Sequence, residues 1–167
     1  MESYRLALQG EQDKSNLFRV HGALGDALMV SGQAVAAVRE YQQALELAAS
    51  EDLGVNPRSV MRYLAWLQAT SDQEGARNAA AALPLARRLV EIDSQEKNRG
   101  SLPASLSVLA AACAEAGRFD QAVSVATRAI ELAESTGQVQ QALRFRRHLE
   151  FYRAARPYRQ NGSELPD

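Results

Sequence analysis

Few side chains in this chain could do catalytic chemistry, and their spacing argues against a catalytic set. The chain has one cysteine, Cys113, and two histidines, His21 and His148, which are far apart. A cysteine nucleophile needs a neighbouring base or cation to form its thiolate, and Cys113 lies in an alanine-rich run without one. Transition-metal ligands recur at short spacings, and no such cluster occurs here. We therefore expect no enzyme activity, no metal and no cofactor, and we interpret Cys113 as core filler.

Other residue types with chemical potential also have a simpler interpretation. Glu91 and Asp93 are close enough in sequence to suggest an acid–base pair, but we interpret them as solvated surface near a helix end. Gly22 and Gly25 do not form a phosphate-binding loop, because they fall within a predicted helix, where they would act as small packing residues.

The C-terminal region is rich in arginine and allows two interpretations. One is contact with RNA or phosphate, which would weaken steeply with salt. The other is a closing helix that needs a soluble outer face. With 19 basic and 20 acidic residues in the whole chain, no strong field favours nucleic acid, so we do not expect a nucleic-acid partner. The residues concerned are Arg144, Arg146, Arg147, Arg153, Arg156 and Arg159.

The only tryptophan, Trp66, also has two interpretations. An indole ring offers a large contact area and one hydrogen-bond donor, so Trp66 could anchor a ligand in a groove. It could equally brace an elongated turn that follows it in the sequence.

Composition indicates that helices position these residues. Alanine, the best helix former, accounts for 30 of 167 residues. No β-strand pattern occurs, no run of 18 apolar residues could span a membrane, and the N-terminus lacks the pattern of a signal peptide. We expect an all-α, cytoplasmic protein without a membrane partner. A single cysteine suits a reducing compartment.

A spacing of small residues occurs twice and predicts paired helices. From the small residue after leucine, the steps are seven, five, four and three both times. Helices approach closely only where side chains are short, so this spacing indicates stacked helical hairpins. The two sets are Gly25, Gly32, Ala37, Tyr41 and Ala44, and Ala110, Gly117, Ala122, Ala126 and Ala129.

Eight helical segments follow from the periodicity and the breaker residues. Ser71 and Asp72 are candidate caps for the fifth, and Pro84 inside it predicts a kink near 80–84 or a helix that begins only there. The tail at 157–167 should fray. The predicted segments are about 2–12, 13–30, 33–49, 57–70, a fifth that follows the loop ATSDQEGARN and ends at about 92, and then 101–117, 119–135 and 139–155.

These residues resemble the tetratricopeptide repeat, a helix–turn–helix unit of 34 residues. The Leu24-Gly25 and Leu109-Ala110 pairs match its first helix, and the turn AEAGRFDQA is typical of it. The middle unit departs most, with about five extra residues in its turn, and resembles a variant found in long bacterial repeat proteins. The ending FYRAARPYRQ is similar to the ending of such proteins. The resemblance implies a right-handed superhelical solenoid with a half repeat at 2–12, repeats at 18–51, 58–96 and 103–136, and a capping helix at 138–155, forming one domain over 1–156.

The resemblance also implies function. We expect a protein-interaction scaffold that binds a peptide or partner domain in a concave groove; the alternative is a regulatory array attached to a bacterial kinase or glycosyltransferase upstream of Met1. The half repeat would leave an apolar face uncovered, which suggests a fragment of a longer array or association of copies. The alternative is that Met1 is the true start and that the helix at 2–12 is a simple cap. The expected groove residues are Arg19, Asp26, Met29, Arg62, Trp66, Ser107 and Glu115.

Overall fold

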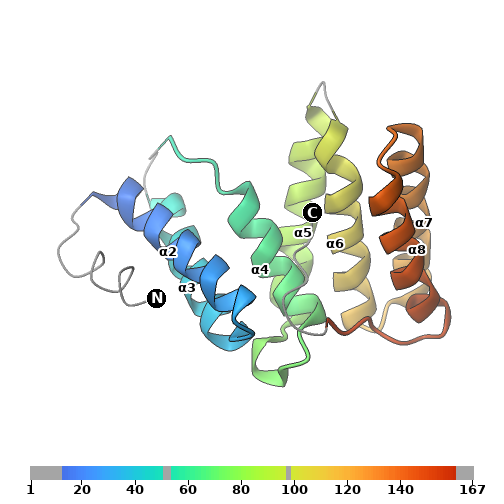
Figure 1. Cartoon of the computed structure of the whole chain (residues 1–167), viewed down its shortest axis with the longest axis horizontal. Coiled ribbons are helices and arrows are strands. Elements are labelled where there is room, and N and C mark those ends of the chain that lie inside the picture. Colours follow the sequence, from blue (N-terminus) through green and yellow to red (C-terminus); the bar gives the residue numbers. More distant parts are fainter. Residues whose placement is uncertain (1–12, 51–53, 97–98, 161–167) are drawn as a thin grey trace.

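A computed structural model describes residues 13–50, 54–96 and 99–160 of the chain. Within these ranges the chain forms seven α-helices and two short 3₁₀ helices, and no β-strand (Figure 1). The helical segment predicted at 2–12, and the oligomer contact predicted for it, lie outside the described residues. The elements are α2 (Lys14–Val30), α3 (Ala34–Ser50), α4 (Arg58–Thr70), η1 (Glu74–Ala76), α5 (Ala79–Gln95), η2 (Arg99–Ser101), α6 (Leu102–Glu115), α7 (Phe119–Ser135) and α8 (Val139–Arg153).

The helices follow one another along the long axis of the molecule (Figure 1). Each α-helix packs against the next one in the chain, and α6 also contacts both α4 and α8. Helix α6 is therefore enclosed, and its residues 102–108 and 110–114 are all buried. The expectation of an all-α fold is confirmed, while the superhelical arrangement of repeats stays a proposal.

The repeated small residues occupy buried positions in two helix pairs, α2–α3 and α6–α7. The first pair is fitted most tightly at Gly25, where a Cβ would lie 2.5 Å from Cε1 of Tyr41. Only glycine allows the Tyr41 ring, itself fully buried, to lie flush against α2. The buried members of the two sets are Gly25, Ala37, Tyr41 and Ala44, and Ala110, Ala122, Ala126 and Ala129.

Four helices end in the same way. The ends of α2, α6 and α7 each place a glycine in the left-handed region, with φ of 74°, 72° and 74°. Two backbone bonds close each turn, such as Gly32 N–H to Met29 O and Gln33 N–H to Leu28 O. Helix α8 ends with the same bonds, but Ala155 takes the place of the glycine at φ 51°. The predicted breaks at Gly32 and Gly117 are confirmed.

The connection between α4 and α5 differs from the prediction. Ser71 and Asp72 do not cap α5; the cap is Asn78, whose side chain accepts from Ala81 N–H. The extra residues, which we expected in the turn, include the short helix η1. Pro84 lies inside α5, which begins at Ala79. The amide that proline lacks would have bonded the carbonyl of the exposed residue Ala80, where water is a ready substitute.

Helix α4 joins the two hydrophobic clusters of the molecule. Its residues Val60, Leu64 and Leu67 belong to a cluster with α2 and α3. On its other side Ala65 and Trp66 belong to a cluster with α5–α8. Within the described ranges, no helix combines the length and apolarity needed to cross a bilayer.

Candidate functional site

The four residues 157–160, which we call the strap, lie across the C-terminal ends of α6 and α4 (Figure 1). We expected this part of the tail to fray, but it is held by the body of the protein. The Gln160 N–H donates to Thr70 O at 2.9 Å, and the Thr70 hydroxyl donates to Gln160 Oε1 at 3.3 Å. Gln160 also forms an isolated parallel bridge with Ser71. Gln160 is therefore tied to the end of α4 through both its backbone and its side chain.

An aromatic cluster holds the middle of the strap. The Tyr158 ring lies 4.2 Å from His148 and 6.0 Å from Trp66, measured between ring centroids. His148 and Trp66 also contact each other at 5.5 Å. Trp66 is only 3% exposed, so it is not accessible to a ligand while the strap is docked. The bracing that we predicted was of the elongated turn after Trp66, whereas its ring contacts are with His148 and with Tyr158 of the strap.

A carboxylate between two arginines completes the contacts. Glu115, the last residue of α6, pairs with Arg159 of the strap at 2.7 Å. It also pairs with Arg77, from the connection between α4 and α5, at 3.3 Å. Because Glu115 is 13% exposed, solvent screens these pairs only partly. Arg77 thus fixes the carboxylate at the place where the strap presents its own cation.

The end of α4 explains why donors are needed here. The last carbonyls of a helix have no partner within the helix. At α4 two of them are satisfied by the connection to α5, through Asn78 N–H to Gln68 O and Arg77 to Ser71 O. The other two are satisfied by the strap, through Gln160 N–H to Thr70 O and, at 3.5 Å, Arg159 to Ala69 O. The strap replaces the cap that a glycine supplies in α2, α6 and α7.

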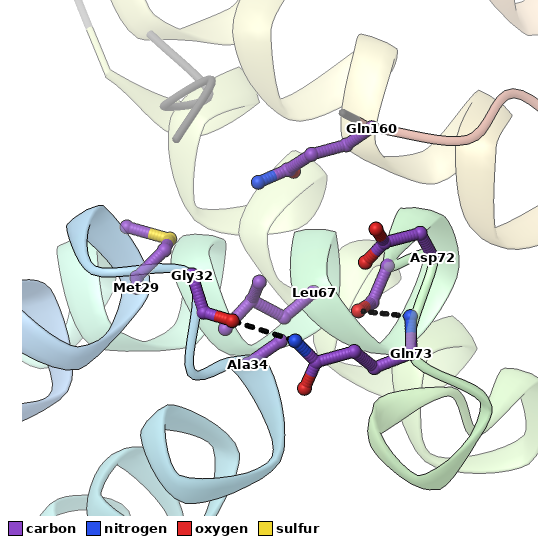
Figure 2. Close-up of a pocket in the computed structure, with 8 residues that line it drawn as sticks. Met29, Gly32, Ala34, Leu67, Asp72, Gln73 and Gln160 are labelled. Carbon is purple, nitrogen blue, oxygen red and sulfur yellow. Dashed lines mark hydrogen bonds between the residues drawn. The ribbon is translucent and has the colours of Figure 1, made fainter. Parts of the chain in front are cut away.

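A small pocket lies where the strap ends. Its volume is about 130 Å³, and Figure 2 shows Met29 and Leu67 on one side and Gln160 opposite. Gln73 borders it and donates to Gly32 O at 2.6 Å, which ties the α4–α5 connection to the α2–α3 turn. A cavity of roughly 150 Å³ can accept a benzene-sized group, so this pocket has room for one side chain.

The structure separates the seven predicted groove residues. Met29, Trp66 and Ser107 are buried, because neighbouring helices close over them. Arg62 and Glu115 are partly buried and engaged in ion pairs. Only Arg19 and Asp26 are exposed, and Asp26 accepts a 2.6 Å bond from the Tyr41 hydroxyl. Trp66 and Glu115 come together at the strap, which the sequence pattern did not indicate; the RPYR stretch was the available signal.

Asp93 corrects our interpretation of the acidic pair near the end of α5. Glu91 is exposed as expected, but Asp93 is completely buried. Its carboxylate faces Arg58 at 3.4 Å and Arg62 at 3.6 Å, and it accepts a bond from the Ser105 hydroxyl. Arg58 also pairs with Glu96, and this bond raises the pKa of Arg58 and lowers that of Glu96. The cluster joins α4, α5 and α6, and its residues are occupied with one another.

Cys113 is buried, as the interpretation as core filler predicts. Burial raises the pKa of its thiol, although Arg87 and Arg118 oppose the effect. A raised thiol pKa disfavours the thiolate that a nucleophile needs. Burial likewise raises the pKa of Tyr41 and of Tyr152, so neither phenol ionises near neutral pH.

Several arginines at the C-terminal end have carboxylate partners. Arg146 pairs with Glu134 and Arg153 with Glu150, in addition to Arg159 with Glu115. Arg156 lies 5.7 Å from the Phe151 ring. These pairs reduce the positive charge available to a phosphate backbone, in keeping with the interpretation as a soluble outer face.

No protein-family model, curated protein or solved structure matches this chain. The functional assignment therefore depends on the geometry of its own residues.

Proposed function

We propose that this chain is an array of tetratricopeptide-like helical hairpins that binds an extended peptide segment of a protein partner. The observation that carries the proposal is the strap. A short extended stretch of polypeptide lies on the ends of α4 and α6, held by a backbone hydrogen bond, a stacked ring and an ion pair. A surface that holds one extended segment offers the contacts by which protein modules recognise peptides.

The hairpin part of the proposal is supported by the repeated spacing. The members of the two sets that lie within helices are buried in α2–α3 and α6–α7, and the remaining members, Gly32 and Gly117, end α2 and α6 at exposed positions. Equal spacing with equal burial is what repeated packing units require. Attachment to a kinase or glycosyltransferase stays a prediction, because no contact in the described ranges bears on it.

A displayed peptide library tests the proposal. The full chain should enrich a set of related peptides, and the face bearing the pocket should determine their binding. We expect Asp72→Lys, at an exposed position that lines the pocket, to weaken the binding of selected peptides at least about tenfold.

Two exposed arginines that do not line the pocket, Arg39 on α3 and Arg128 on α7, provide control positions for a change of charge. Their replacement by glutamate should leave binding unchanged, since they lie away from the pocket. A library that enriches no peptide family, or peptides sensitive to Arg39→Glu and Arg128→Glu alone, would contradict the proposed function.

A further inference from the structure

The strap lies on the ends of the helices and is held at two points, by Tyr158, which packs against the hydrophobic cluster, and by Gln160, which is buried. Its residues 157–159 are only partly buried, and the preceding residues 153–156 are exposed. The Arg159 side chain keeps 34% exposure even while it pairs with Glu115. A short segment held mainly by one backbone hydrogen bond, an aromatic contact and an ion pair opens at lower cost than the helices beneath it. The surface under the strap is therefore accessible on opening.

The turn that directs the strap is strained. Ala155 adopts φ 51°, where the other helix ends with the same bonds use glycine. The left-handed region is unfavourable for a residue with a Cβ, because the Cβ approaches the following carbonyl oxygen. The strap thus returns to α4 and α6 against a local backbone preference, which brings the docked state closer in free energy to the open one.

The surface under the strap specifies the chemistry of its occupant. Trp66 and His148 present buried rings to one aromatic side chain. Glu115, already paired with Arg77, forms an ion pair with one further guanidinium. The carbonyls of Ala69 and Thr70 need donors, which Arg159 and the next backbone N–H supply. These three requirements fall on consecutive residues, in the order aromatic, arginine, backbone donor.

We propose that this surface is a recognition site for an extended partner segment in which an aromatic residue is followed directly by arginine. The strap is its intramolecular occupant, and the partner segment displaces it. This inference rests on the proposed function, since it names the chemistry of the segment that the peptide-binding surface takes. The pocket of about 130 Å³ beside Gln160 would receive a side chain further along the same segment.

Competition between strap and partner can be measured in the full chain. The probe is a blocked, fluorescent peptide of sequence RPYRQ, which copies residues 156–160. Wild-type protein should bind it weakly, because the docked strap reduces the fraction of competent molecules. Replacing Tyr158 and Arg159 together by alanine should loosen the strap and tighten peptide binding at least tenfold by fluorescence anisotropy.

The matched control is Arg153→Ala, which removes an exposed arginine near the strap without touching the surface beneath it. It should bind the peptide as the wild type does. Circular dichroism verifies that each variant keeps its helices. Emission from Trp66, the only tryptophan, should shift to the red in the loosened variant and return when the peptide binds.

A charge exchange separates recognition from a purely structural role. In the loosened background, Glu115→Arg should abolish binding of RPYRQ and allow binding of RPYEQ. A folded, loosened variant that binds RPYRQ no better than wild type would overturn the proposal. Wild-type chains that dimerise through Tyr158 would also overturn it, because the occupant would then be the strap of a second copy.

The peptide library distinguishes this failure from failure of the proposed function. If the enriched peptides bind equally well to the wild type and to the loosened variant, the peptide-binding function still holds. The proposal that the strap competes with the partner segment would then be wrong. Absence of any enriched family would remove the proposed function itself.

Discussion

The turn between α6 and α7 closes with its own residues, whereas the connection between α4 and α5 depends on distant ones. Gly117 and two backbone bonds to Ala114 and Cys113 complete the first. The second takes donors from the strap, and its residue Gln73 donates a hydrogen bond to Gly32 O in the α2–α3 turn. The difference shows that the α6–α7 turn satisfies its backbone groups with nearby residues. The α4–α5 connection instead bonds to the strap and to the α2–α3 turn, and so links distant segments of the chain.

The largest expected effect concerns a regular hairpin. Gly25→Leu should lower the free energy of unfolding by about 3 kcal/mol, since the side chain must displace the Tyr41 ring. Urea unfolding followed by circular dichroism measures it. The control is Gly22→Ala on the same helix, where the new Cβ meets Val60 Cγ2 at an ordinary 3.5 Å. Gly22→Ala should leave the free energy of unfolding unchanged or raise it by up to about 1 kcal/mol. Equal losses of stability from the two variants would contradict our account of Gly25.

The next effect concerns the middle unit. Asp93→Ala should cost about 2–3 kcal/mol, because it leaves Arg58 and Arg62 without their buried carboxylate. The partial exposure of both arginines keeps the loss below the roughly 3–5 kcal/mol typical of breaking a fully buried ion pair. Glu91→Ala removes an exposed carboxylate paired with Arg88 and should cost less than about 0.5 kcal/mol. Similar losses from the two variants would show that Asp93 has no special role.

Double-mutant cycles test the contrast between the two connections directly. Arg77→Ala and Arg159→Ala share Glu115, so their effects on unfolding should couple by about 0.5–1 kcal/mol. Gly117→Ala should cost about 1 kcal/mol through backbone strain and add independently to Arg159→Ala. Coupling in the Gly117 cycle, or additivity in the Arg77 cycle, would break the distinction between self-contained and dependent connections.

The smallest expected effect is a gain. Ala155→Gly relieves the left-handed strain at the end of α8 and should raise stability by about 0.5–1 kcal/mol. Ala154→Gly, one residue earlier at φ −83°, should instead lower stability by about 0.5 kcal/mol. Thermal melting of both variants makes the comparison, and a loss at position 155 would show that the turn is not strained.

Local patterns predicted much of the fold. Alanine content, periodicity and the placement of Gly32 and Gly117 indicated helices and their ends, because capping and helix propensity act over a few residues. The buried small-residue sets were also predictable, since close helix contact limits side-chain size wherever it occurs. The cap of α5 was not predictable, because Ser71, Asp72 and Asn78 are all suitable capping residues. Asn78 is the cap because the residues between Asp72 and Asn78 include the separate helix η1.

The candidate site was predictable only in part. Trp66 and Glu115 were expected in a groove, but nothing in their spacing indicated that residues 157–160 would cover them. Asp93 appeared to be surface, because its arginine partners Arg58 and Arg62 lie a whole helical unit earlier in the chain. Contacts over such separations depend on how α4, α5 and α6 pack, which no local pattern contains.

The sequence by itself determined that this chain forms alanine-rich helical pairs, because turn glycines and short side chains restrict the backbone locally. The tertiary structure alone decided that Asp93 is buried, that the strap docks on α4 and α6, and which groove residues remain exposed. The physical reason is that an ion pair, a stacked ring or an orphan carbonyl finds its partner only after the helices have been placed in space.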